Sequence, residues 1–294
     1  MTIRLLATDL DGTLLGHDGL VSPGNRRALS IAQSAGLDVM FVTGRPPRWL
    51  PSVIEQTGFT GQIVSANGGI VVDAARRCVV RTFPMKTTAA SEAIDRMLQA
   101  VPGLEFGVER SEVGMRLADP NGNHVPSLVD ETSPNREFVM TPGYRPSGAV
   151  AGLIPTGPIH ELIADDRAVK IVARPPRGDH RNADELLAII VDAIGGLLQA
   201  THSNIDDILI EFSAAGVTKG STLALLATEL GYAPNEVAAV GDMPNDAPML
   251  SWVGHPYVVA NAHASLLAQF HEVLPRNDQD AVGQLLLMLA KELN

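Results

Sequence analysis

The sequence has little cysteine, few aromatic residues and no long hydrophobic run. Cys78 is the only cysteine among 294 residues, so no disulfide can form within the chain, as is typical of a reducing compartment. No apolar stretch approaches the roughly 18 residues of a membrane-spanning helix. Arg4 interrupts the apolar run at the N-terminus, which therefore does not resemble a secretory signal. We expect a cytoplasmic protein that does not bind a membrane.

Positive charge is also scarce. The chain has 22 Lys and Arg against 33 Asp and Glu, and its net charge of −11 argues against a nucleic-acid-binding surface. A small anionic substrate remains possible, because a bound metal ion can reverse the field of a site. The aromatic fraction is only 4%, which leaves few rings for stacking on nucleobases. We expect a monomer or a small homo-oligomer with a small-molecule substrate.

Strand and helix patterns alternate in the first and last parts of the chain. Buried strands are predicted at 4–8, 37–42, 62–65 and 237–240, with helices between them and a final helix at 281–293. This alternation predicts an α/β fold with a doubly wound, Rossmann-like parallel sheet. Ligands of such sheets bind beyond the carboxyl ends of the strands.

The middle of the chain has a different texture. Residues 84–212 are rich in Pro and Gly, with helical periodicity at 88–101 and 182–198 and short strand-like pieces. This pattern predicts an inserted α+β domain between two parts of one core. The length also suits two domains better than one. We expect a core made of 1–83 and 213–294 and an insert, or cap, of 84–212.

Two acids follow the first predicted strand. Asp9 and Asp11 lie two residues apart, so on a strand their side chains would face the same pocket. A carboxylate beside a divalent cation stays ionised and can attack phosphorus, while a second one can act as general acid and base. Gly12 then allows a tight turn with free backbone N–H groups. The alternative is an ordinary Asp-Gly turn without chemistry.

Two further groups follow the same logic. Thr43, Gly44 and Arg45 come after a predicted strand, where a hydroxyl and a close N–H suit a phosphate oxygen. Taken by itself, this group is better explained as a strand-to-helix turn with Thr43 as the N-cap. Lys219 opens a predicted helix, where the helix dipole disfavours a cation. It is therefore either held to neutralise a carboxylate or phosphate, or it is a solvated surface lysine.

Acidic and amide side chains also follow the strand 237–240. Asp242, Asn245 and Asp246 lie within five positions, whereas one residue would suffice to cap the next helix. Magnesium prefers oxygen ligands and commonly uses one or two protein carboxylates with the substrate phosphate. Asp9 and Asp242 could supply them. His255 and His263 lie nearby, but their spacing is not that of metal ligands.

The order of these groups resembles the four motifs of the haloacid dehalogenase superfamily. The matching strings begin at Asp9, Thr43, Lys219 and Gly241, and their details are similar to the Cof-type branch (class IIB), whose cap lies between the second and third motifs. The resemblance covers 1–83 and 213–294. In the cap the resemblance lies mainly in where the insert occurs in the chain, and Lys170 and Glu211 are the only cap residues that suggest a similarity to the family.

The resemblance implies a role for each motif residue and a Mg²⁺ cofactor. Asp9 would be nucleophile and metal ligand, and Asp11 would be the acid/base that offers its backbone carbonyl to the metal. Asp242 would be a further metal ligand, and Asp246 would support the metal site or Lys219. Lys219 would steady the nucleophile and the phosphate, and Thr43 would also act in catalysis. The implied substrate-binding residues are Gly12, Thr43, Gly44, Arg45, Lys219 and Asn245. Dehalogenases of the superfamily lack an acid at the position of Asp11, so its presence favours phosphoryl transfer.

The expected function is that of a phosphoric monoester hydrolase. We expect a magnesium-dependent phosphatase that removes phosphate from a small metabolite, a sugar or sugar-acid phosphate, through an aspartyl-phosphate. The alternatives are a sugar phosphomutase or phosphoglycosyl-compound phosphatase on the same core, and a catalytically idle sensor of a phosphorylated ligand. A nicotinamide-dependent enzyme is disfavoured, because no G-x-G-x-x-G follows a predicted strand.

Overall fold

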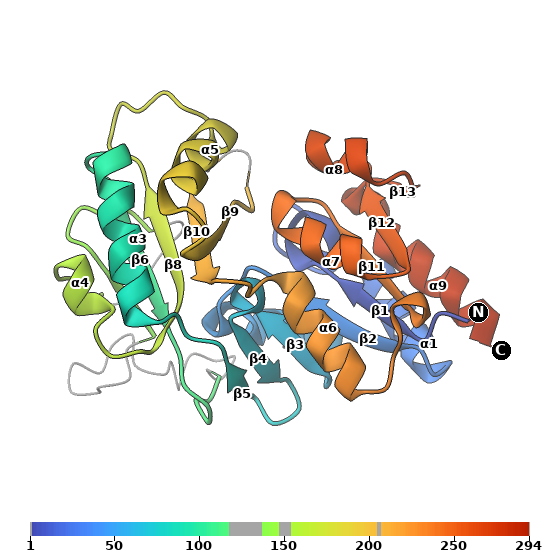
Figure 1. Ribbon diagram of the computed structural model, residues 1–294. Coiled ribbons are helices and arrows are strands. Elements are labelled where there is room, and N and C mark those ends of the chain that lie inside the picture. The colour runs from blue at the N-terminus through green and yellow to red at the C-terminus, as the bar shows by residue number, and fades with distance from the viewer. Residues whose placement is uncertain (1, 118–136, 147–153, 205–206, 294) are drawn as a thin grey trace.

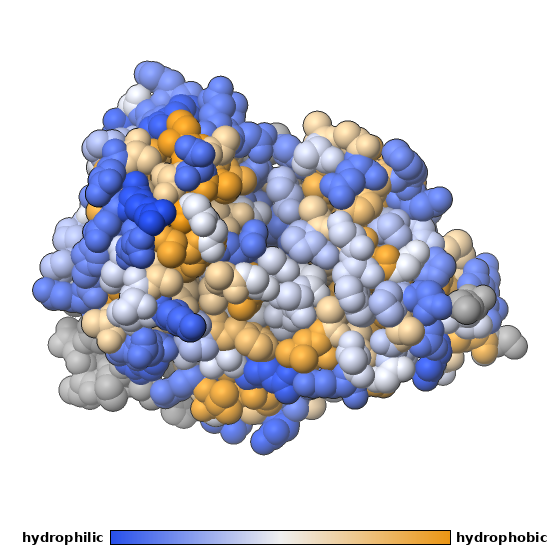
Figure 2. All heavy atoms as spheres, viewed as in Figure 1, coloured by the Kyte–Doolittle hydropathy of each residue, from blue (hydrophilic) through white to orange (hydrophobic). Residues whose placement is uncertain are grey.

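Two separate β-sheets organise the molecule. The computed structural model describes residues 2–117, 137–146, 154–204 and 207–293. Figure 1 shows the two sheets side by side, each with its own helices, and Figure 2 shows two lobes with a notch between them. Within the described residues, no helix is both long and apolar enough to cross a membrane.

The larger sheet has the order β13-β12-β11-β1-β2-β3-β4-β5, and its first six strands run parallel. The bounds of its strands are β1 Leu5–Thr8, β2 Asp38–Val42, β3 Gln62–Ser65, β4 Ile70–Asp73, β5 Cys78–Thr82, β11 Val237–Gly241, β12 His255–Val259 and β13 Val273–Leu274. The strands β1 and β11 are fully buried neighbours, although more than 220 residues separate them in the sequence. The expected Rossmann-like α/β fold is confirmed.

Helices cover both faces of this sheet. They are α1 Pro23–Ser34, α2 Pro51–Thr57, α6 Lys219–Glu229, α7 Ala247–Trp252, α8 Ala264–Gln269 and α9 Ala281–Leu293. The units β1-α1-β2 and β11-α7-β12 progress in opposite directions along the sheet, so right-handed crossovers place α1 and α7 on opposite faces. α1 packs against α9, and α6 packs against α7 in front of the sheet in Figure 1.

The smaller sheet is antiparallel, with the order β7-β6-β8-β10-β9. Its elements are α3 Thr87–Ala100, β6 Glu105–Arg110, β7 Phe138–Met140, α4 Ile159–Leu162, β8 Ala168–Arg174, α5 Ala183–Ile194, β9 Leu198–Thr201 and β10 Ile210–Ala214. α3 and α5 pack on each other and enclose an apolar cluster of their own, separate from that of the larger sheet. β10 extends two residues beyond the boundary predicted at 212.

One predicted helix is too long. The periodicity suggested helix over 182–198, but α5 ends at Ile194, where Gly195 adopts a left-handed φ of +56°. Leu198 instead begins the short strand β9. Glycine ends helices in this way because it has no Cβ to oppose a positive φ. The apolar residues that prolonged the helical pattern therefore belong to two elements.

Candidate active site

The turn after β1 brings the first acids against the end of β11. The backbone N–H of Asp9 donates to the carbonyl of Val240 at 3.0 Å, which extends the pairing of the two strands. Gly12 follows with φ +75°, and a Cβ at this position would lie 2.2 Å from Oδ2 of Asp242. Only glycine fits both the conformation and the space. The turn therefore holds its backbone directly against Asp242.

Lys219 lies at the centre of a buried ionic cluster. Its Nζ is 2.7 Å from Oδ1 of Asp9 and 2.7 Å from Oδ1 of Asp246, and the residue is only 1% exposed. The alternative of a solvated surface lysine is therefore wrong. The lysine starts α6, whose N-cap Thr218 accepts a hydrogen bond from the N–H of Ser221. The helix start thus fixes a cation between two acids that follow different strands.

Asp246 and Asp242 complete the cluster. Oδ2 of Asp246 accepts the backbone N–H groups of Asp242 at 3.0 Å and Met243 at 3.1 Å, so this carboxylate shapes the loop after β11. Oδ1 of Asp242 accepts the hydroxyl of Thr13 at 3.1 Å. Asp246 therefore uses both oxygens within the protein, whereas Oδ2 of Asp242 faces Gly12.

The cluster carries more negative than positive charge. Burial raises the pKa of Asp9 to about 7, even though Lys219 opposes this rise. Burial and the neighbouring Asp9 raise the pKa of Asp242 well above its ordinary range. Burial alone would lower the pKa of Lys219, but Asp246 and Asp9 outweigh it and raise that pKa. Three carboxylates around one ammonium form an environment that favours an additional cation.

This donor set fits a hard divalent ion. One oxygen from each of Asp9, Asp242 and Asp246 lies within 4.8 Å of the others, and all three residues are buried. Oxygen-only ligands suit Mg²⁺ or Ca²⁺ better than softer metals. A dication would also favour the ionised forms of Asp9 and Asp242, against the burial and the repulsion that raise their pKa values. The residues present therefore fit the metal that the sequence implies.

Asp11 does not join this cluster. Its two carboxylate oxygens accept Nε and Nη2 of Arg45 at 2.7 and 2.6 Å, and its side chain is 55% exposed. Arg45 follows β2, as predicted. Thr43, the last buried residue before this turn, accepts the N–H of Arg45 with its Oγ1 at 3.1 Å. The structure therefore gathers Asp9, Lys219 and Asp242, and it pairs Asp11 with Arg45 beside them.

A chain of polar contacts leads from the core into the smaller sheet. Asn245 donates to Oδ1 of Asn67 at 3.1 Å, and Asn67 donates to Oε2 of Glu211 at 2.7 Å. Lys170 lies 2.5 Å from Oε1 of Glu211 and donates to the carbonyl of Gly44 at 2.9 Å. Both cap residues are buried, and the Lys170 charge lowers the pKa of Glu211 against the effect of burial.

An ionic contact also joins the two units. Arg48, which lies between β2 and α2, forms a bidentate pair with Glu109 of β6, with Nη2 2.8 Å from Oε1. Both side chains are largely buried. Burial raises the pKa of the neighbouring Glu137 to about 7, although Arg48 opposes this. The smaller sheet therefore meets the core through charged and amide groups next to the loop of Thr43.

Sequence reasoning did not select three residues that the structure places here. Asn67 begins the sequence Asn-Gly-Gly, which is typical of a turn, and its φ of +55° agrees with that local role. Thr13 bonds Asp242, and Asn261 donates to the carbonyl of Gly12 at 2.8 Å. Thr13 belongs to the string that begins at Asp9, but no local pattern in the sequence indicates the bonding partner of Thr13, Asn67 or Asn261.

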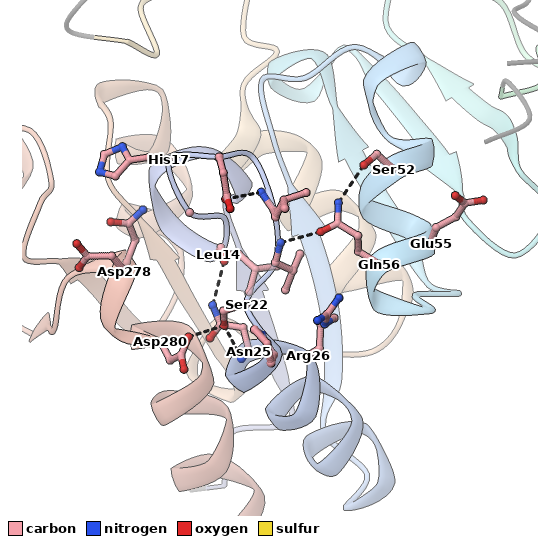
Figure 3. Close-up of a pocket in the computed structure, with 16 residues that line it drawn as sticks. Leu14, His17, Ser22, Asn25, Arg26, Ser52, Glu55, Gln56, Asp278 and Asp280 are labelled. Atoms are coloured by element: carbon pink, nitrogen blue, oxygen red, sulfur yellow. Dashed lines mark hydrogen bonds between the residues drawn. The ribbon is translucent and has the colours of Figure 1, made fainter. Parts of the chain in front are cut away.

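A separate hollow lies on the far side of the turn after β1. Figure 3 shows this pocket, of about 790 Å³, between the loop of His17, the start of α1, the helix α2 and the segment around Asp278. None of the predicted site residues lines it. Some of its polar groups bond one another, and one such bond runs from the backbone N–H of Val21 to Gln56 at 2.8 Å. It is therefore distinct from the ionic cluster.

Comparisons with known proteins agree with this arrangement. The profile of the haloacid dehalogenase-like hydrolases matches residues 6–286, which is nearly the whole chain. The chain belongs to this family. The family membership expected from the four motifs is thereby confirmed. The match spans both parts of the core and the insert between them.

Individual relatives are distant but cover the whole length. Phosphatase YwpJ of Bacillus subtilis is 25% identical, over 97% of this chain and 99% of its own. The 5-amino-6-(5-phospho-D-ribitylamino)uracil phosphatase YwtE of the same organism is also 25% identical, over 96% of each chain. A haloacid dehalogenase-like hydrolase structure from B. subtilis superposes with a TM-score of 0.74 at 21% identity, over 97% of this chain and 99% of the other. This last likeness supports the fold alone.

Proposed function

We propose that this hydrolase is a magnesium-dependent phosphatase that acts on a small phosphorylated metabolite through an aspartyl-phosphate. The observation that carries the proposal is the buried cluster in which Lys219 bridges Asp9 and Asp246, with Asp242 alongside. Stability does not require this arrangement, because burying charge is costly and apolar residues would pack as well. Perturbed, buried acids of this kind are typical of catalytic sites.

The broad enzyme class rests on the family. Relatives that are named phosphatases match almost the entire chain, so the expectation of a phosphoric monoester hydrolase is confirmed. The substrate is a finer question. The name of one relative specifies a phosphorylated ribityl chain, which supports the proposal of a sugar phosphate or sugar-acid phosphate for this protein.

Asp9 and Asp242 are the proposed metal-binding side chains, with the backbone carbonyl of Asp11 as a further ligand. Asp246 is the proposed support, because its two oxygens already bond Lys219 and the loop N–H groups. Bound Mg²⁺ supplies positive charge that keeps Asp9 ionised and offsets charge on the phosphoryl oxygens. Thr13 orients Asp242 through its hydroxyl.

The proposed chemistry has two steps. A carboxylate oxygen of Asp9 attacks phosphorus, the bond from phosphorus to the leaving oxygen breaks, and Asp11 gives that oxygen its proton. Asp11 then takes a proton from water, whose oxygen attacks phosphorus and breaks the bond to Asp9. Lys219 offsets the negative charge of the transferring group throughout. Phosphate and a free hydroxyl compound are the products.

The remaining motif residues are proposed to bind the phosphoryl group. They are Gly12, Thr43, Gly44, Arg45, Lys219 and Asn245. Arg45 holds both oxygens of Asp11 in this structure, so the two must separate before Asp11 can exchange a proton with the substrate. The phosphate dianion of an arriving substrate can compete with Asp11 for Arg45, because a guanidinium group binds phosphate as well as carboxylate.

The smaller sheet is the proposed specificity cap. We retain residues 1–83 and 213–294 as the core and 84–212 as the cap. Lys170 and Glu211 are its proposed substrate contacts, because they reach Gly44 and Asn67 at the edge of the site. Location in the cytoplasm and the oligomeric state stay predictions.

The test is release of phosphate from a panel of phosphorylated metabolites with Mg²⁺. We expect turnover of sugar phosphates that stops in excess chelator and returns with Mg²⁺. The Asp9→Asn variant should be inactive although folded, and Asp11→Asn should retain the mass of one phosphoryl group after reaction with p-nitrophenyl phosphate. Activity of Asp9→Asn near that of the wild type would exclude the proposed nucleophile.

The same experiment separates the alternatives. A phosphomutase would convert a sugar phosphate into its isomer without releasing phosphate, which chromatography of the products detects. An idle sensor would bind phosphorylated compounds without changing them. Either result would contradict the proposed hydrolysis.

A further inference from the structure

Two histidines and an aspartate meet where the smaller sheet faces α8. Asp184 is the second residue of α5, His202 follows β9, and His263 is the N-cap of α8 in the core. Nε2 of His202 is 2.8 Å from Oδ1 of Asp184, and Nε2 of His263 is 3.3 Å from Oδ2. Three residues separated by up to 79 positions therefore present their polar atoms to one point.

We propose that Asp184, His202 and His263 form a second metal site, for a transition metal such as Zn²⁺, that joins the smaller sheet to the core. One ligand atom of each residue lies within 4.8 Å of the others. Tetrahedral zinc with bonds of about 2.0–2.1 Å places its ligands about 3.4 Å apart. The observed separations of 2.8 and 3.3 Å need only a small expansion to admit the ion.

The ligand types separate this site from the first one. Imidazole nitrogen with one carboxylate suits Zn²⁺ and its neighbours, whereas Mg²⁺ binds oxygen almost exclusively. The side chain of Asp184 is 60% exposed, so water can reach a fourth position. The ionic cluster around Lys219, by contrast, offers oxygen alone. The two sites would therefore select different metals.

Metal binding through Nε2 requires the proton of each ring to move from Nε2 to Nδ1. Nδ1 of His263 accepts the backbone N–H of Ser265 at 3.3 Å, so its proton lies on Nε2, which faces Asp184. With a metal on Nε2 that proton would move to Nδ1, where the hydroxyl of Ser265, 2.7 Å away, can accept the N–H and orient the ring. His202 is 1% exposed, and its Nδ1 has no hydrogen-bond partner. Moving the ring proton of His202 from Nε2 to Nδ1 gives up the hydrogen bond to Asp184, and the bond from the freed lone pair of Nε2 to the metal would replace it.

This site would act on the catalytic loop through the backbone. The N–H of His263 donates to the carbonyl of Asp242 at 2.7 Å. Asp184 and His202 belong to the smaller sheet, so a metal held by all three residues would fix that sheet relative to the loop of Asp242. The proposed role is thus a metal clasp between the two units.

Cobalt(II) titration tests the clasp, because Co²⁺ absorbs visible light when nitrogen ligands bind it and zinc does not. The full chain carrying Asp242→Asn is used as the parent, so that the first site is disabled. We expect one Co²⁺ per chain, an intense visible band, and loss of that band when Zn²⁺ is added. Asp184→Asn and His263→Gln, each added to the parent, should weaken binding at least about tenfold.

The matched control is His160→Gln in the same parent. His160 also pairs with a carboxylate, Asp95, at 3.1 Å, but no second histidine among the described residues joins this pair to form a possible metal site. We expect it to bind Co²⁺ like the parent. Asp184 is exposed, so its variant should fold, and the thermal midpoint of each variant without metal verifies this. A parent that binds no Co²⁺ would overturn the clasp, as would Asp184→Asn and His263→Gln variants that bind Co²⁺ as tightly as the parent.

Discussion

Replacing Lys219 with methionine should destabilise the protein strongly, because it leaves two acids buried without their cation. Lys219 contacts Asp9 and Asp246 at 2.7 Å each and is almost completely shielded from solvent. Removing one partner of a buried ion pair costs about 3–5 kcal/mol in the free energy of unfolding. For a domain of this size, that corresponds to a fall in the thermal midpoint on the order of 10 °C.

The measurement is thermal unfolding in the presence of a chelator, so that no divalent cation replaces the ammonium group. The matched control is Arg81→Met. Arg81 contacts Glu229 at 2.9 Å, but both side chains are well exposed, so the pair should contribute less than about 1 kcal/mol. The comparison thus varies burial while it keeps the type of interaction.

The loss of stability caused by Lys219→Met should also depend on pH. At about pH 5 Asp9 is already protonated in the folded protein, because burial raises its pKa to about 7, and it then needs no counterion. The destabilisation should therefore be smaller at pH 5 than at pH 8. Equal midpoints for Lys219→Met and Arg81→Met at pH 8 would refute the view that Lys219 offsets buried charge.

Three further outcomes follow from the same site. In chelator, the free energy of unfolding should contain a component that decreases as the pH rises from about 4 to 7, because the pKa of Asp9 is raised to about 7 in the folded state and the folded protein therefore holds this proton more tightly than the unfolded chain. Urea titrations at several pH values should show this component in the wild type and not in Asp9→Asn. Gly12→Ala should reduce Mg²⁺-dependent phosphate release at least about tenfold, since its methyl group would lie 2.2 Å from Asp242 in a backbone conformation that alanine resists; unchanged kinetics would contradict the close approach. Arg45→Gln should raise KM for a phosphorylated substrate more than it changes kcat, because the guanidinium that holds Asp11 is also the proposed phosphate ligand; an unchanged KM would remove Arg45 from that role.

The sequence was sufficient to predict the parts of the fold that local pattern determines. The strands that end at Thr8 and Val42 are short apolar runs followed by polar turns, and periodicity of 3.6 marks the long helices. The edge strand β5 and the strand β9 were not predicted. Each has only four or five residues, so pairing with neighbours rather than its own pattern determines its conformation.

The candidate site was predictable in its members but not in its pairings. Each acid could be identified because it follows a strand, and parallel strands end at a common edge. The pairing of Asp11 with Arg45 depends on how two loops approach, which no spacing encodes. The meeting of His202 and His263 likewise depends on how the smaller sheet packs against the core.

The two ionic contacts next to Gly44 differ in which unit carries each charge. Lys170 and Glu211 both belong to the smaller sheet, so a change in the spacing of the two units would move both charges together. Arg48 and Glu109 belong to different units, and separation would pull their charges apart into solvent. Dissolved salt screens separated charges and has little effect on a pair that stays together. Of these two contacts, the one between Arg48 and Glu109 is therefore the one through which ionic strength should act on the spacing of the units.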